Sequence, residues 1–232
     1  MATSEGGQAL VRPLLLGHRG DRKNSEIPEN SFASFDLALK NGCDGFEFDV
    51  RLTLDGKAVI CHDPRFRGRS ISRTKQADLR ELPTFEAILE RYSQNAFLNI
   101  ELKVAGLEVQ CLQLLKHHPP AKGYVVSSFL PAAVSTLRDF DVDTPLGIIC
   151  GNRAQLARWP NLATHFVMVE KSLVTPGLVK KLHEAEKQVF VWTVNNTRTM
   201  ARFADFKVDG MISDDTAALV ATLGSKAHSL PC

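Results

Sequence analysis

The stretch GFEFDVRLTLDGKAVICHDP, residues 45–64, places acidic side chains inside a segment that otherwise has the pattern of a buried strand. Side chains alternate across a strand, so Glu47 and Asp49 share one face and the phenylalanines beside them share the other. An ionised carboxylate is costly to bury alone. We therefore expect water, a cation or a metal ion to meet the face that carries the two acids.

The composition indicates one compact domain. The chain has 232 residues, of which 44% are hydrophobic and 23% charged, enough apolar material for a large core. Lys and Arg number 28 against 26 Asp and Glu, and they are spread along the chain. This gives no case for a nucleic-acid partner, although a small anion-binding pocket is invisible in net charge. The oligomeric state stays open.

Cysteine usage and the N-terminal residues indicate a cytoplasmic protein. The five cysteines are widely spaced and form no Cys-x-x-Cys pair, which is typical of reduced thiols. The first residues, MATSEGGQALVRPLLLG, lack the pattern of a signal peptide. No stretch approaches the roughly 20 apolar residues that span a bilayer. We expect no stable membrane association.

Short apolar runs alternate with helical periodicity along most of the chain. The runs are LLLG (14–17), GFEFDV (45–50), AVICH (58–62), FLNIELK (97–103), YVVSS (124–128), PLGIIC (145–150), FVMVE (166–170), VFVWTV (189–194) and GMIS (210–213). Strands alternating with helices predict a parallel sheet, and this many units favour a single-domain α/β fold of the TIM (β/α)₈ barrel type. We expect this domain over residues 14–223, an N-terminal extension over 1–13 and a C-terminal tail over 224–232.

Nine runs for eight barrel strands mean that one run is extra. Only TLDGK separates the acidic strand from AVICH, too little for a helical crossover. The spacing predicts that the chain runs back down the barrel before Asp55 and Gly56 turn it up again. His62 then returns to the same rim as Asp49.

Polar side chains gather where four of the predicted strands end. They are His18 and Arg19 after the first run, Glu47 and Asp49 in the second, His62 and Asp63 after the third, and Glu101 and Lys103 at the end of the fourth. In a barrel of this type the active site lies at the carboxyl ends of the strands. Three carboxylates without cysteines suit Mg²⁺ or Ca²⁺ better than a structural zinc.

The basic residues at these strand ends complete a candidate site. Arg19 and Lys103 can hold an anion, for which phosphate is the natural candidate. His18 and His62 can serve as acid and base because histidine titrates near neutral pH. Alternatively, the acids could form a structural ion-pair cluster with the basic residues, but three acids and two bases leave negative charge to neutralise.

Several motifs in fixed order give the chain a family resemblance. They are HRG (18–20), PENSFASFDLAL (28–39), the quoted stretch 45–64, IELK (100–103) and VWTVN (191–195). In this combination the chain resembles the glycerophosphodiester phosphodiesterases, over about residues 14–220. The resemblance implies a TIM-barrel hydrolase that cleaves glycerophosphodiesters to glycerol 3-phosphate and an alcohol with one divalent cation, Mg²⁺ or Ca²⁺.

The same resemblance implies roles for single residues. Glu47, Asp49 and Glu101 would be metal ligands, His18 and His62 the general acid and base, and Arg19 and Lys103 phosphate ligands. Asn30 of the PEN element would support the substrate site. A hydroxyl of the substrate glycerol would attack first, and water would then open the cyclic phosphate. Trp192 could stack on the substrate or fill the barrel.

Two departures from the family pattern leave the substrate open. The segment between His62 and Glu101 is shorter than is common in the family, and the stretch DRKNSEI (21–27) is slightly longer. The shortened segment carries Arg65, Arg67 and Arg69, which could bind a second anionic group or be solvated. A lysophospholipase D-like specificity is therefore an alternative, and a phosphate-binding barrel without catalysis is another.

Overall fold

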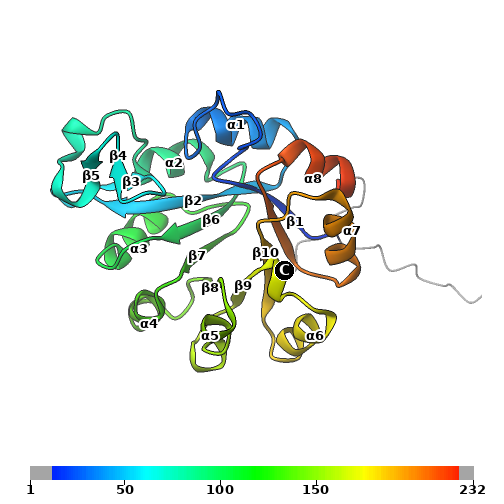
Figure 1. The fold of residues 1–232 in the computed structure, drawn as a ribbon. Coiled ribbons are helices and arrows are strands. Elements are labelled where there is room, and N and C mark those ends of the chain that lie inside the picture. Colours follow the sequence, from blue (N-terminus) through cyan, green and yellow to red (C-terminus); the bar gives the residue numbers. More distant parts are fainter. Residues whose placement is uncertain (1–11, 225–232) are drawn as a thin grey trace, which may run out of the picture.

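A closed barrel of parallel strands forms the centre of the protein (Figure 1). The computed structural model describes residues 12–224. Within them, eight parallel strands close through the pairing of β1 with both β2 and β11. The barrel strands are β1 (Leu14–His18), β2 (Gly45–Leu52), β6 (Phe97–Leu102), β7 (Tyr124–Ser128), β8 (Leu146–Cys150), β9 (Phe166–Glu170), β10 (Gln188–Trp192) and β11 (Gly210–Ser213). The predicted TIM barrel is confirmed.

Helices surround the strands (Figure 1), and most of them begin at a side-chain cap. They are α1 (Phe32–Lys40), α2 (Phe85–Tyr92), α3 (Glu108–His117), α4 (Pro131–Phe140), α5 (Arg153–Leu156), α6 (Pro176–Glu184), α7 (Thr197–Asp205) and α8 (Thr216–Leu223). The Ser31 hydroxyl accepts a hydrogen bond from the amide of the third residue of α1, and Thr84 and Thr175 do the same for α2 and α6. These caps define the residue at which each of the three helices begins.

Apolar side chains pack on both sides of the barrel wall. Outside it, Phe46 of β2 stacks on Phe35 of α1 with ring centroids 4.2 Å apart. Inside it, Phe97, Phe166 and Phe190 fill the lower part of the barrel. The acidic face of β2 therefore points inward above an apolar floor, as the alternation along this strand predicts.

The extra strand is AVICH, which forms β3 (Ala58–Ile60) antiparallel to β2. The prediction that the chain first runs back down the barrel was wrong. Strand β2 instead continues above the rim to Leu52, turns at Asp55 and Gly56, and returns as β3 with Ile60 opposite Val50. A hairpin needs only a tight turn, so five residues are enough. His62 still reaches the predicted rim.

The remaining elements are short and lie mainly between β3 and α2. They are β4 (Arg65–Phe66), β5 (Arg69–Ser70) and the 3₁₀ helices η1 (Ile71–Arg73), η2 (Gln76–Asp78), η3 (Trp159–Asn161) and η4 (Lys171–Leu173). The predicted N-terminal extension and C-terminal tail lie outside the described residues, apart from residues 12, 13 and 224. No helix within residues 12–224 combines the length and hydropathy that crossing a bilayer requires.

Candidate active site

The four predicted strand ends meet around one cavity at the mouth of the barrel. The cavity has a volume of about 150 Å³. One side, here called the charged half, is lined by His18, Arg19, Glu47, His62, Glu101 and Lys103. The other side, here called the apolar half, is lined by Phe129, Ile149, Met168, Trp192 and Ile212 from β7 to β11 and the loops that follow them. Seven of the nine predicted site residues line this cavity.

Three carboxylates lie together at the base of the charged half. Glu47, Asp49 and Glu101 are almost fully buried, and one oxygen of each lies within 4.8 Å of the others. The buried Oε1 of Glu47 has no hydrogen-bond partner. Burial, followed by the charges of Asp49 and Glu101, raises the pKa of Glu47 well above its usual range. An oxygen-only donor set with an unpartnered buried oxygen fits a hard divalent cation.

The other two acids respond differently to the same surroundings. Burial and the neighbouring charge of Asp49 raise the pKa of Glu101 to about 7. Burial opposes ionisation of Asp49 as well, but the positive charges of Lys103 and Arg19 lower the pKa of its carboxyl. Asp49 is therefore the acid that the basic residues keep ionised, whereas Glu47 and Glu101 hold their protons more readily because these cations do not fully offset burial and the neighbouring acids.

The two cations of the charged half pair with these acids. The Lys103 Nζ lies 2.7 Å from Glu101 Oε1 and 3.2 Å from Asp49 Oδ1. The Arg19 Nε lies 3.2 Å from Asp49 Oδ2, and its Nη1 donates to Glu29 Oε1 at 2.9 Å. Part of the ion-pair alternative is thus present, yet Glu47 Oε1 stays outside every pair. Both cations also face the cavity, where an anion could bind.

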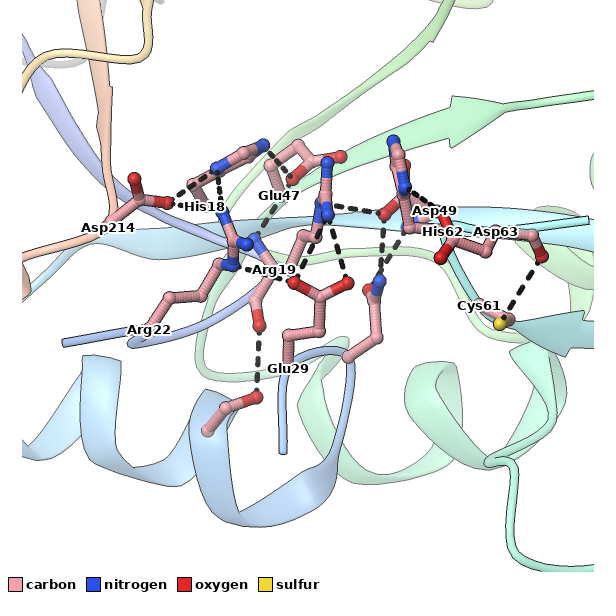
Figure 2. A network of polar contacts seen from close by, with 12 residues as sticks. His18, Arg19, Arg22, Glu29, Glu47, Asp49, Cys61, His62, Asp63 and Asp214 are labelled. Carbon is pink, nitrogen blue, oxygen red and sulfur yellow. Dashed lines mark hydrogen bonds and ion pairs between the residues drawn. The ribbon is translucent and has the colours of Figure 1, made fainter. Parts of the chain in front are cut away.

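The two histidines stand on either side of the acids (Figure 2). His18 lies between Asp214, whose Oδ1 is 2.7 Å from its Nδ1, and Glu47, whose Oε2 is 3.9 Å from its Nε2. His62 pairs through Nδ1 with Asp63 Oδ1 at 2.8 Å. Burial lowers the pKa of His62, because the Asp49 charge only partly offsets it. His62 is therefore mainly neutral near pH 7.

Asn30 supports Asp49 from behind the cavity. Its Nδ2 donates to Asp49 Oδ2 at 2.7 Å, and its Oδ1 accepts from the Asp49 amide at 3.3 Å. Asn30 is buried and adopts a φ of +55°, a region that asparagine tolerates better than most residues. The structure thus places this predicted substrate ligand against an acid and outside the cavity lining.

Trp192 forms a wall of the apolar half. Its Nε1 donates to the Met168 carbonyl at 3.2 Å, and its ring meets Phe129 edge-on with centroids 5.6 Å apart. Phe190, two residues earlier, fills the barrel below it. Trp192 thus lines the cavity and also packs on the apolar side chains that fill the barrel. A ring fixed by a hydrogen bond and an aromatic contact offers a rigid surface to a ligand.

The three arginines of the shortened segment lie outside the cavity lining. Arg65 donates to the Gly68 carbonyl at 3.0 Å and Arg69 to the Asp78 carbonyl at 3.1 Å. Arg67 pairs with Glu81 at 2.6 Å. All three are exposed. Of the two open interpretations, this arrangement favours solvated arginines over a second anion site.

Sequence reasoning missed four polar residues that hold the charged half in place. Glu29 bridges Arg19 and Arg22, and Arg22 also contacts Asp214. Asn195 donates to Asp214 Oδ2 at 2.6 Å. A signal was present for two of them, because Asp214 directly follows the last strand and Asn195 follows shortly after β10. The rule that polar strand ends converge applies to these strands as well.

Comparison with known proteins gives consistent matches over nearly the whole chain. The model of the Glycerophosphoryl diester phosphodiesterase family matches residues 18–98 and 69–218. A glycerophosphodiester phosphodiesterase of Caldanaerobacter subterraneus subsp. tengcongensis is 26% identical over 90% of this chain and 97% of its own.

Solved structures give the same result. A phosphodiesterase of Oleispira antarctica, solved in complex with the product sn-glycerol-3-phosphate, matches with a TM-score of 0.80 and 25% identity over 92% of this chain and 98% of its own. A glycerophosphodiester phosphodiesterase of Parabacteroides distasonis matches with a TM-score of 0.78 and 25% identity, over 90% of this chain and 94% of its own.

Proposed function

Because the chain belongs to the glycerophosphoryl diester phosphodiesterase family, we propose that it hydrolyses glycerophosphodiesters to glycerol 3-phosphate and an alcohol. One observation carries this proposal: three buried carboxylates, two histidines and two cations line or underlie the same cavity. A binding protein for phosphate needs only the cations. The histidines and the additional acids are suited to general acid–base catalysis and to holding a catalytic cation, which the hydrolysis of a phosphodiester can use.

The acids of the charged half are suited to a divalent cation. Glu47, Asp49 and Glu101 would hold it, and Mg²⁺ and Ca²⁺ are the ions that an all-carboxylate set favours. When bound, the cation would polarise a phosphoryl oxygen and acidify the attacking hydroxyl. The raised pKa of Glu47 and Glu101 means that cation binding must compete with protons at both groups.

The two histidines would move the protons of the reaction. His62, neutral near pH 7, accepts the proton of the attacking glycerol hydroxyl as its oxygen bonds to phosphorus. His18 donates a proton to the oxygen of the departing alcohol as the bond between that oxygen and phosphorus breaks. In the second step water attacks the cyclic phosphate, and the two imidazoles exchange roles. Arg19 and Lys103 bind the phosphoryl oxygens and offset their charge.

Release of glycerol 3-phosphate from glycerophosphocholine tests the proposal. We expect turnover with Mg²⁺ or Ca²⁺, loss of turnover in EDTA, and recovery when the cation is added back. Inactivity toward a panel of glycerophosphodiesters in the presence of these cations would contradict the proposal and favour a phosphate-binding barrel. Binding of inorganic phosphate, followed by calorimetry, would then identify that barrel.

A second candidate activity, cleavage of a lysophospholipid, is favoured by the apolar half. Five apolar side chains there could meet an acyl chain as well as a small alcohol. In the same assay, silence on glycerophosphocholine with cleavage of lysophosphatidylcholine would indicate this specificity.

A further inference from the structure

The carboxylate that contacts His18 comes from the opposite end of the chain. Asp214 follows β11, the last barrel strand, and His18 ends β1, the first. Closure of the barrel pairs these two strands side by side. The Asp214 Oδ1 thereby lies 2.7 Å from His18 Nδ1, on the side of the ring away from Glu47 (Figure 2).

The surrounding contacts indicate which ring nitrogen of His18 carries a fixed proton. Arg22 Nη1 lies 3.3 Å from Nδ1, but a guanidinium only donates hydrogen bonds. An unprotonated Nδ1 would accept from Arg22 and leave the nearby Asp214 oxygen facing a lone pair. A protonated Nδ1 donates to Asp214 at 2.7 Å, and Arg22 donates to the same oxygen at 2.8 Å. The second arrangement satisfies all three groups.

Asp214 is itself held at every polar atom. Its Oδ2 accepts from Asn195 Nδ2 at 2.6 Å, its amide donates to Asn195 Oδ1 at 2.9 Å, and its carbonyl accepts from the Arg22 amide at 2.9 Å. Burial would raise the pKa of this carboxyl, but the hydrogen bonds from His18 and Asn195 hold it below its usual range. A charged carboxylate with no freedom to rotate can fix the imidazole that it contacts.

The partner of the other histidine lacks this support. The Asp63 side chain is 73% exposed, against 25% for Asp214. Asp63 also neighbours His62 in sequence, so the pair forms without tertiary structure. The contrast assigns an orienting role to the half-buried pair of His18 and Asp214 alone.

We propose that Asp214 is the positioning residue of His18, that it keeps a proton on Nδ1 so that Nε2 faces the reacting phosphodiester, and that Arg22 and Asn195 hold Asp214 in place. The inference rests on the proposed function, in which His18 exchanges its proton through Nε2. It adds Arg22, which lies in the lengthened stretch 21–27, and Asn195 of the VWTVN motif to the residues that serve the reaction.

Kinetics of Asp214 variants test the proposal. Asp214→Asn should lower kcat about 100-fold and leave KM within about threefold, because the amide can donate to Nδ1 and so favours the wrong tautomer. Asp214→Glu, which restores the carboxylate, should recover a large part of the lost kcat. The matched control is Asp209→Asn, which breaks the surface pair of Asp209 with His183 at 2.8 Å and should leave kcat unchanged. A kcat of Asp214→Asn near that of the wild type would overturn the proposal.

Nitrogen-15 NMR of the histidine rings gives a readout that does not depend on activity. The His18 signal, assigned by its loss in His18→Gln, should show a protonated Nδ1 in the wild type and a shift toward the other tautomer in Asp214→Asn. A wild-type His18 protonated on Nε2 alone would overturn the inference, even if hydrolysis is observed. A protonated Nδ1 in a protein that cleaves no phosphodiester would instead overturn the proposed function and leave the geometry intact. If Asp214→Asn fails to fold, Arg22→Gln replaces it in the test. This variant should lower kcat by less than Asp214→Asn would and leave KM nearly unchanged, and an unchanged kcat would contradict the proposal.

Discussion

The charged half and the apolar half of the barrel mouth are built on opposite principles. The charged half is held by a chain of ion pairs behind the cavity, which runs from Asp214 through Arg22 and Glu29 to Arg19. In the apolar half, the described polar contacts of the side chains are few: the indole nitrogen of Trp192 donates to the Met168 carbonyl, and the Met168 sulfur accepts from Asn99. One half is therefore fixed by hydrogen bonds, and the other by packing.

The difference indicates that the charged half serves the chemical steps and the apolar half serves substrate recognition. Groups that move protons or offset charge should be oriented before the substrate arrives, because their reorganisation during the reaction would raise the activation free energy. An organic group of the substrate needs only a fitting apolar surface, which recognises shape more than chemistry. Changes in the charged half should consequently affect kcat and cation binding, and changes in the apolar half should affect KM and substrate choice.

Loss of either histidine should give the largest effect. His18→Ala and His62→Ala should each lower kcat by about a thousandfold, since each removes a group that transfers a proton in both steps. Steady-state release of glycerol 3-phosphate measures the change, and circular dichroism checks the fold. His183→Ala, which removes a histidine from the outer surface, should keep full activity. If one histidine variant keeps its kcat, that residue is not the acid or the base.

Removal of one carboxylate should weaken cation binding. Glu47→Gln should reduce the affinity for Mg²⁺ or Ca²⁺ by about 100-fold, because the amide oxygen carries no charge and the buried Oε1 has no other partner. Isothermal calorimetry measures the affinity directly. Glu184→Gln, an exposed change on α6, is the matched control. An affinity equal to that of the wild type would remove Glu47 from the ligand set.

The raised pKa of Glu101 predicts a pH-dependent stability without the cation. In the folded protein the carboxyl keeps its proton up to about pH 7, whereas the unfolded chain releases it near pH 4.5. The folded state binds more protons between these values, so its stability is full below pH 4.5 and falls as the pH rises to 7. In EDTA, the free energy of unfolding should drop by about 3 kcal/mol across this window.

Urea denaturation of the wild type and Glu101→Gln at pH 5 and pH 7.5 checks this slope. Glu101→Gln should flatten it, because the amide does not titrate, and Glu184→Gln should keep the wild-type slope. Equal slopes in the wild type and Glu101→Gln would show that the carboxyl of Glu101 titrates at its ordinary value in the folded protein.

Local patterns in the sequence were enough to predict which acidic side chains meet at the charged half of the barrel mouth. The alternation along β2 places Glu47 and Asp49 inward wherever that strand is packed, and strand ends in a parallel barrel share one rim. Asp214 could not be paired with His18 in the same way, because 196 residues separate them and only closure of the barrel brings them together. The direction of β3 was missed for a related reason, since it depends on the free edge that β2 offers.

The apolar half should respond weakly and in a different kinetic constant. Trp192→Ala should raise KM about tenfold and change kcat by less than about threefold, because it removes an aromatic wall worth roughly 1 to 2 kcal/mol of binding and no group that reacts. Trp192→Phe, which keeps an aromatic surface, should retain most of the affinity, and Phe140→Ala, which removes an exposed ring on α4, should have no effect. A fall in kcat as large as that of the histidine variants, with KM unchanged, would mean that the indole orients the reacting groups and that the two halves do not divide the work.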